Sequence, residues 1–121
     1  MFEVQVETAR NRIYVALTGF ASLEDVQQFE NDLKRALDRL PANRGPHQML
    51  YDVSGAQIQS QDVVRALRRF ALDCPPTSAF ALVNGSALAG RQLSRIFRGI
   101  AVHACGDREE AVKWLNAQRI I

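Results

Sequence analysis

The stretch Tyr51-Asp-Val-Ser-Gly-Ala-Gln-Ile-Gln-Ser-Gln-Asp62 decides the fold of this chain. The apolar run at its start predicts a short strand over residues 48–53. Asp52, Ser54 and Gly55 then have the composition of a turn, because such residues bond nearby backbone amides or accept unusual backbone conformations. Ser60 suits the N-cap of a helix, since its hydroxyl can accept a hydrogen bond from the first turn. The stretch therefore predicts a strand, a turn and a capped helix.

The spacing of apolar residues predicts further elements on both sides of this stretch. Alternation at 2–6 and 13–17 predicts two strands, joined into a hairpin by a turn at 9–12. Three- and four-residue spacing predicts helices over 22–40 and 60–74. Ser86 is predicted to cap a third helix, which has a buried stripe from Ala89 to Ile100. Asp107 is predicted to cap a fourth helix, in which Trp114 points inward. Apolar runs at 79–83 and 101–105 predict two more strands.

The order of these elements is ββαβαβαβα. Strands that alternate with helices favour an α/β fold in which the later strands are parallel. We therefore expect a mixed sheet of about five strands, an opening antiparallel hairpin and about four helices. The length of 121 residues and the hydrophobic content of 47% fit one domain over residues 1–121.

Composition argues against several classes of function. A net charge of +2 gives no overall field for nucleic acid or a membrane surface. Cys74 and Cys105 form no CxxC pair, and His47 and His103 lie far apart, so neither a zinc site nor another cofactor is expected. The amino terminus does not resemble a signal peptide, and no apolar run reaches the ~20 residues that cross a bilayer. We expect a soluble cytoplasmic protein without a transmembrane segment.

The loop after the central strand is the candidate site for a partner. In open α/β sheets, ligands and partners meet the carboxyl edge of the strands. The candidate residues there are Asp52, Ser54, Gly55, Ser60, Gln61 and Asp62. Turn formation and helix capping explain the same residues without a partner. The two interpretations are compatible, because a capping hydroxyl at a helix start is also exposed.

Two groups of arginines form a candidate basic surface. Arg65, Arg68 and Arg69 fall on one side of the second predicted helix. Arg91, Arg95 and Arg98 recur at three- and four-residue steps on the third. Such a surface suits an acidic protein or an anionic lipid, although a solvated helix face is the simpler interpretation. Nucleic acid is unfavoured, because the nearby aromatic residues belong to the apolar stripes.

Two patterns that resemble catalytic motifs are incomplete. The stretch Gly85-Ser-Ala-Leu-Ala-Gly90-Arg91-Gln92 lacks the Lys and the Ser or Thr that a phosphate-binding loop requires. His103 and Cys105 share one face of a predicted strand, but no third group is present to orient them. The sequence therefore predicts that the protein is not an enzyme.

The chain resembles the STAS domain family, the fold of bacterial anti-sigma-factor antagonists. Three segments carry the resemblance: residues 50–67, the strand 80–83 and the terminal helix 107–115. Within the first segment, the strand end and loop of the family are matched by Asp52, Ser54, Gly55 and Ile58. It implies a partner-binding loop and a phosphorylatable serine at the start of the second helix. The family's Asp-Ser-Ser-Gly turn is replaced here by residues 59–62, so that Ser60 lies at or one residue from the modified position. The chain is closer to uncharacterised single-domain members than to the well-known antagonists.

These observations predict a non-catalytic regulatory domain that binds a protein partner and is controlled by phosphorylation of Ser60. The alternative is a lipid- or small-molecule-binding domain, which would need an apolar cavity between sheet and helices with arginines at its mouth. A third possibility is a homodimer formed through the edge of the hairpin.

Overall fold

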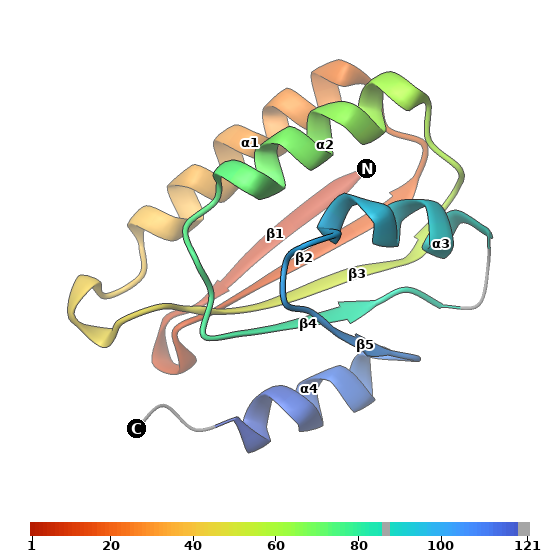
Figure 1. The fold of residues 1–121 in the computed structure, drawn as a ribbon. Helices are drawn as coiled ribbons and strands as arrows, with labels where there is room; N and C mark the ends of the chain where they lie inside the picture. Colours follow the sequence, from red (N-terminus) through yellow and green to blue (C-terminus); the bar gives the residue numbers. More distant parts are fainter. Residues whose placement is uncertain (86–87, 119–121) are drawn as a thin grey trace.

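The computed structural model describes residues 1–85 and 88–118 and contains a five-stranded mixed sheet with helices on both faces (Figure 1). The strands are β1 (Phe2–Glu7), β2 (Arg12–Gly19), β3 (Gln48–Ala56), β4 (Ala79–Val83) and β5 (His103–Cys105). The α-helices are α1 (Leu23–Asp38), α2 (Gln61–Asp73), α3 (Leu88–Ser94) and α4 (Arg108–Ala117). Short 3-10 helices are η1 (Thr8–Arg10), η2 (Ala42–Arg44) and η3 (Arg95–Phe97). The predicted fold class and element order are confirmed.

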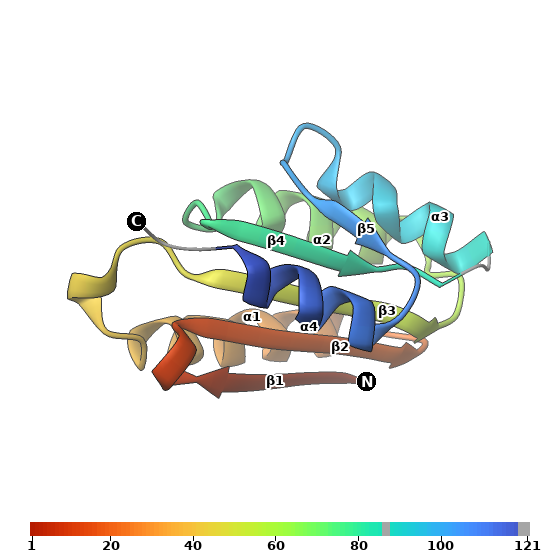
Figure 2. The ribbon, with the colours of Figure 1, turned by 90° about the horizontal axis from the view of Figure 1, so that it is seen from below.

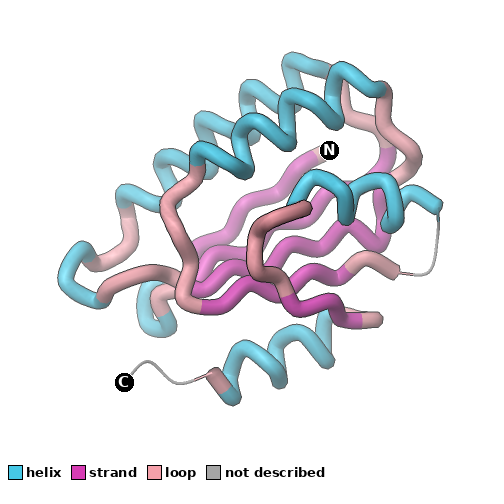
Figure 3. Tube along the Cα trace, in the orientation of Figure 1, coloured by secondary structure: helices cyan, strands magenta, loops and turns pink. Residues whose placement is uncertain are grey.

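The strands lie in the sheet in the order in which they occur in the sequence. β1 and β2 pair antiparallel, and β2 to β5 pair parallel. Because each parallel crossover is right-handed and moves in the same direction, the connecting helices α1, α2 and α3 cover one face. Among the helices of the described residues, α4, which follows the last strand, is the one that packs on the other face (Figure 2). Figure 3 shows the resulting three layers, with the sheet between the two helical layers.

Side-chain caps explain where three of the helices begin. Ser22 Oγ accepts from Asp25 N at 3.1 Å while the Asp25 carboxylate accepts from Ser22 N, a capping box before α1. Ser60 caps α2 and Asp107 caps α4 through the same kind of bond. The predicted cap Ser86 lies outside the described residues. The capped starts fix the loops that enter these helices.

Each face of the sheet has its own apolar core. Under α1 and α2 the centre is aromatic: the Phe29 ring stacks on Phe2 at 4.4 Å and meets Phe70 and Tyr51 edge-on at 5.7 and 6.0 Å. Under α4 the core is smaller and is built from Leu50, Ala79, Ala81, Val83, Cys105, Ala111 and Leu115. Leu50 and Tyr51 therefore point to opposite faces, as successive residues of a strand must.

A buried polar group ties α4 to the sheet. The Arg12 guanidinium donates two hydrogen bonds to Gln48 Oε1, at 2.9 and 2.7 Å, and a third to Asn116. Gln48 Nε2 in turn donates to the Leu115 carbonyl at 3.0 Å. The turn predicted at 9–12 lies one residue earlier, at 8–11: η1 and Asn11, which has a positive φ of 52°, make the turn, and Arg12 already belongs to β2.

Other element boundaries also differ from the sequence prediction. β3 continues past Val53 to Ala56, because the end of β2 continues to pair with it. The first helix ends at Asp38 rather than at residue 40. The third predicted helix is split, because the chain tightens into η3 after Ser94 and leaves Ile100 beyond the helical turns. Trp114 is only half-buried and stacks on His103 at 4.4 Å. No described helix combines the length and apolar character needed to cross a bilayer.

Candidate functional site

The candidate residues gather at the carboxyl edge of the parallel strands, where the loops after β2, β3 and β4 meet (Figure 1). The loop after β2 leads to α1, and the loop after β3 leads to α2. This edge is where an α/β sheet ordinarily presents binding residues. The structure confirms that the stretch 51–62 forms a strand, a loop and a capped helix, and it changes the role of several residues in it.

Val53 and Ser54, directly after Asp52, form a bulge within β3 rather than a turn after it. Ala16 pairs with Asp52 but Thr18 pairs with Gly55, so β3 has one residue more than β2 between these pairs. The Asp52 carboxylate accepts from Ser54 N at 3.0 Å and from Ser54 Oγ at 2.6 Å. The side chain thus satisfies an amide at the irregularity in the ladder. Asp52 also lies 3.9 Å from Arg108 of α4, which places it on the α4 side of the sheet.

Gly55 serves close packing, which differs from the backbone role predicted for it. Its φ is not positive, but a Cβ there would lie 3.1 Å from Thr18 Cγ2. Gly85, with a φ of 62°, brings the loop after β4 against Ser54: a Cβ at Gly85 would lie 3.4 Å from Ser54 Cα. Two glycines thus let three consecutive strand ends approach one another.

Gln59 organises this edge and was missed as a site residue by sequence reasoning. Its side chain is buried, accepts from Ala21 N at 2.8 Å and donates to Gly19 O and Gln57 O at 2.9 and 2.6 Å. Gln92 of α3 then pairs with the Gln59 backbone through two bonds of 2.7 Å. The buried Gln59 therefore fixes the loops that precede α1 and α2, and the half-buried Gln92 connects these loops to α3. Glutamine is usually exposed, so no pattern in the sequence indicated that Gln59 is buried.

Ser60, Gln61 and Asp62 lie together at the start of α2 and are all exposed. Ser60 Oγ accepts from Val63 N at 3.3 Å, which confirms the predicted cap. Asp62 pairs with Arg65 at 3.0 Å on the surface of the helix. This group belongs to the α2 side of the sheet, whereas Asp52 faces α4. The candidate residues therefore form two clusters on either side of one edge.

Large apolar side chains are exposed in all three strand-to-helix connections along the same edge. Phe20 follows β2 and is 67% exposed, Ile58 follows β3 and is 52% exposed, and Leu88 begins α3 and is 68% exposed. Each belongs to a different strand-to-helix connection, so the edge presents apolar groups across three neighbouring segments. Apolar groups gathered in this way mark interaction surfaces more often than single scattered ones do. We call Phe20, Ile58 and Leu88 the apolar edge.

The six arginines do not form one uniform basic surface. Arg68 donates to the backbone carbonyls of Ile96, at 2.8 Å, and of Arg98, and so fastens η3 to α2. Arg65 is paired with Asp62, and Arg69 borders a surface hollow that also contains acidic residues. Arg91, Arg95 and Arg98 are exposed, but they belong to α3, η3 and the residue after η3. The predicted row of three on one helix is wrong because the helix ends at Ser94.

The incomplete catalytic patterns acquire structural roles. Gly90 lies inside α3, where a Cβ would come within 2.0 Å of Asn84 O, so it serves close packing. Cys105 is buried in the α4-side core, where burial raises the pKa of its thiol, whereas His103 is exposed and stacks on Trp114. Within residues 1–85 and 88–118, no three His, Cys, Asp or Glu side chains are grouped to hold a metal ion.

Solved structures share this fold across almost the whole chain. An uncharacterized protein of the DUF3478 family from Shewanella loihica, with a SpoIIAA-like fold, matches with a TM-score of 0.70 at 15% identity, over 95% of this chain and 92% of its own. An anti-sigma factor antagonist from Mycobacterium paratuberculosis matches with a TM-score of 0.64 at 12% identity, over 96% and 95% of the two chains. The anti-sigma factor antagonist SpoIIAA, in its unphosphorylated form, matches with a TM-score of 0.61 at 14% identity, over 97% and 99%.

These matches establish a STAS-like, SpoIIAA-like fold for the chain. The sequence itself matches no protein-family model and no curated protein. Identities of 12–15% show the fold alone and assign no activity to the chain.

Proposed function

We propose that the chain is a non-catalytic regulatory domain that binds a protein partner through the carboxyl edge of its sheet. The observation that carries the proposal is the apolar edge, in which Phe20, Ile58 and Leu88 are each more than half exposed. Burying side chains of this size contributes about 1.5–3 kcal/mol each when they leave water completely. The exposed polar groups at the start of α2 would then form the rim of such an interface.

The edge is suited to binding because its loops are fixed before a partner arrives. Gln59 and Gln92 join the entrances of α1 and α2 to α3 through five hydrogen bonds. Loops held in one conformation lose little entropy on association, which favours affinity. Two structural neighbours bear the name anti-sigma factor antagonist, which supports a regulatory protein partner for this fold. That support is by analogy of fold.

Ser60 is the proposed control point at this edge. Its side chain is exposed and caps α2, where the positive end of the helix dipole favours a phosphate. The carboxylate of Asp62 would repel the negative charge of this phosphate, although it is paired with Arg65. Incubation with ATP and an extract of the source cells, followed by mass spectrometric mapping, tests this step. Modification at Ser60 is expected, and an unmodified Ser60 when a known antagonist is modified in the same extract would refute it.

Partner binding is tested by comparing captured proteins between matched variants. Ile58→Asp places a charge in the apolar edge, whereas Leu72→Asp places one on an equally exposed leucine at the far end of α2. A partner of this edge should be retained by wild type and by Leu72→Asp and lost by Ile58→Asp. Titration calorimetry with that purified protein should then show an affinity loss of at least tenfold for Ile58→Asp. Equal binding by all three proteins would refute the proposal.

An anionic lipid is less well supported than a protein partner. The apolar cavity between the sheet and the helical layer formed by α1 and α2 is lined by 19 described residues, and none of these is Lys or Arg. The arginines that the lipid alternative needs at a cavity mouth are therefore absent from this lining. A charged headgroup would enter it without a counter-ion, which is unfavourable.

A further inference from the structure

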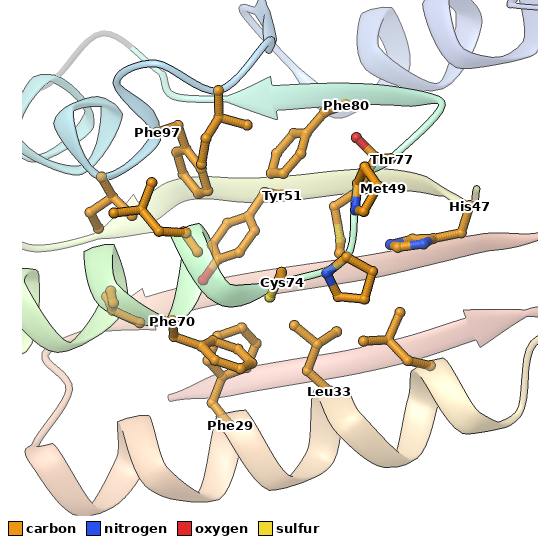
Figure 4. Close-up of a pocket in the computed structure, with 18 of the residues that line it drawn as sticks. Phe29, Leu33, His47, Met49, Tyr51, Phe70, Cys74, Thr77, Phe80 and Phe97 are labelled. Carbon is orange, nitrogen blue, oxygen red and sulfur yellow. The ribbon is translucent and has the colours of Figure 1, made fainter.

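The cavity beneath α2 is a candidate site that lies apart from the carboxyl edge. It has a volume of about 310 Å³ and lies where α1, the end of α2 and the chain after η3 approach the sheet (Figure 4). Aromatic and aliphatic side chains from the sheet and the helices line most of it, with Phe29, Phe70, Phe80 and Phe97 around Tyr51. Its size and apolar lining are those of small-molecule sites in proteins.

Tyr51 places one polar group within this apolar lining. The residue is buried, and its ring packs at 5.1 Å from Phe97 and 6.0 Å from Phe29. Within residues 1–85 and 88–118, the Tyr51 hydroxyl is paired with no protein group and is not among the fully enclosed polar atoms, so it reaches the space of the cavity. A hydroxyl that reaches this space can bond to water or to the polar group of a ligand. The cavity therefore offers a ligand an unused hydrogen-bonding position.

The titratable side chains of the lining, Tyr51, Cys74 and His47, are uncharged near neutral pH. Burial raises the pKa of the Tyr51 hydroxyl far above its usual value, and the neighbouring Cys74 thiol adds to this. Burial, with smaller contributions from Asp73 and Glu30, raises the pKa of Cys74 to about 11. Burial also lowers the pKa of His47, which keeps its imidazole neutral. Among the described lining residues there is no Asp, Glu, Lys or Arg.

We propose that this cavity binds a small neutral molecule that is mainly apolar and carries one hydrogen-bonding group directed at the Tyr51 hydroxyl. A cavity of roughly 150 Å³ holds benzene in a dry apolar core, so a volume of 310 Å³ has room for about a dozen non-hydrogen atoms. Two fused rings with one hydroxyl fit that description. A carboxylate or phosphate does not, because it would lose its hydration without gaining a counter-ion.

The two sites are separated along α2. Ser60 caps the start of this 13-residue helix at the carboxyl edge, and Cys74 follows its end at the cavity. At 1.5 Å per residue the helix spans about 20 Å. A test of the cavity is therefore independent of a test of the apolar edge, and either proposal can fail without the other.

2-Naphthol is a suitable probe because it is neutral at pH 7, fluorescent and has eleven non-hydrogen atoms, about the number that the cavity holds. Fluorescence titration of the full chain should show saturable binding of 2-naphthol and binding of 2-naphthoate that is weaker by at least about tenfold. Tyr51→Phe removes only the hydroxyl. It should weaken 2-naphthol by about five- to tenfold and leave the affinity for naphthalene within about twofold.

A cavity-filling variant locates the binding. Ala71 on α2 lines the cavity, and Ala71→Phe should abolish binding of both probes, whereas Ala117→Phe on the far helix α4 should not affect it. Circular dichroism establishes whether each variant is folded; if Ala71→Phe is not, the Tyr51→Phe comparison decides alone. The proposal is overturned if 2-naphthol does not bind, if 2-naphthoate binds equally well, or if Tyr51→Phe weakens naphthalene as much as 2-naphthol.

Discussion

Replacing Gln59 by alanine removes the side chain that joins the loops before α1 and α2. The variant loses the acceptor for Ala21 N and the donors to Gly19 O and Gln57 O. It keeps both backbone bonds to Gln92, because these do not involve the Gln59 side chain. The change therefore isolates the contribution of one buried amide group.

The size of the effect follows from these three bonds. Each hydrogen bond contributes about 1 kcal/mol net, and a buried amide left without an acceptor costs up to about 3 kcal/mol. Ala21 is only half-buried, so water recovers part of that loss. We expect the free energy of unfolding to fall by about 2–3 kcal/mol, a large part of the 5–15 kcal/mol typical of a domain. With an m-value of about 1.5 kcal/mol per molar urea, the midpoint should fall by about 1.3–2 M.

Urea unfolding monitored by circular dichroism measures this shift, and Gln57→Ala is the matched control. Gln57 is an exposed glutamine in the same loop, and its contribution to Gln59 comes from its backbone carbonyl. The control should stay within about 0.5 kcal/mol of wild type. Gln59→Glu adds a pH test, since its carboxylate would face two carbonyls and become less unfavourable when protonated at low pH. A midpoint shift for Gln59→Ala no larger than that of the control would refute this role.

Three further predictions concern packing and titration. Gly90→Ala would place a Cβ 2.0 Å from Asn84 O and should destabilise the fold by about 3 kcal/mol in urea unfolding. The control Gly106→Ala, whose Cβ has its nearest contact at 3.5 Å, should be nearly neutral. Equal effects of the two variants would contradict the role of Gly90 in close packing. Burial lowers the pKa of His47 from 6.5, so the unfolded state binds more protons and stability should fall as the pH drops below about 6.5. His47→Leu should reduce the slope of the unfolding free energy against pH between pH 7 and pH 5. An unchanged slope would show that His47 does not cause this pH dependence. The rate of Cys74 alkylation by iodoacetamide should rise with a midpoint near the raised pKa of about 11, and a midpoint at pH 9 or below would show an exposed thiol.

The elements of the fold could be predicted because their signals are local. Alternation, three- and four-residue spacing and the caps Ser22, Ser60 and Asp107 depend on residues close together in sequence. The extension of β3 through Ser54 and Gly55 could not be predicted, because it depends on pairing with Thr18 and Gly19 of another strand. Residues typical of a turn therefore lie in a bulged strand.

The position of the candidate residues at the carboxyl edge could be predicted, but the side chains that hold the loops there could not. The carboxyl edge follows from the order of the elements, and Ser60 has the capping role expected of it. Gln59 and Gln92 were not identified, because glutamine is usually exposed and only the folded backbone shows that Gln59 is buried and that Gln92 pairs with its backbone. The basic row was wrong for a related reason, since the end of α3 at Ser94 depends on how η3 packs against α2.

The strand order has a consequence for synthesis of the chain. Because each strand pairs with its predecessor in sequence, the sheet can assemble outward from its amino-terminal hairpin as the ribosome releases it. The face beneath α4 is the exception, since Leu50 and Ala81 emerge well before Ala111 and Leu115, which later pack against them. A nascent chain that has not yet reached α4 thus displays an uncovered apolar face to chaperones and to other chains.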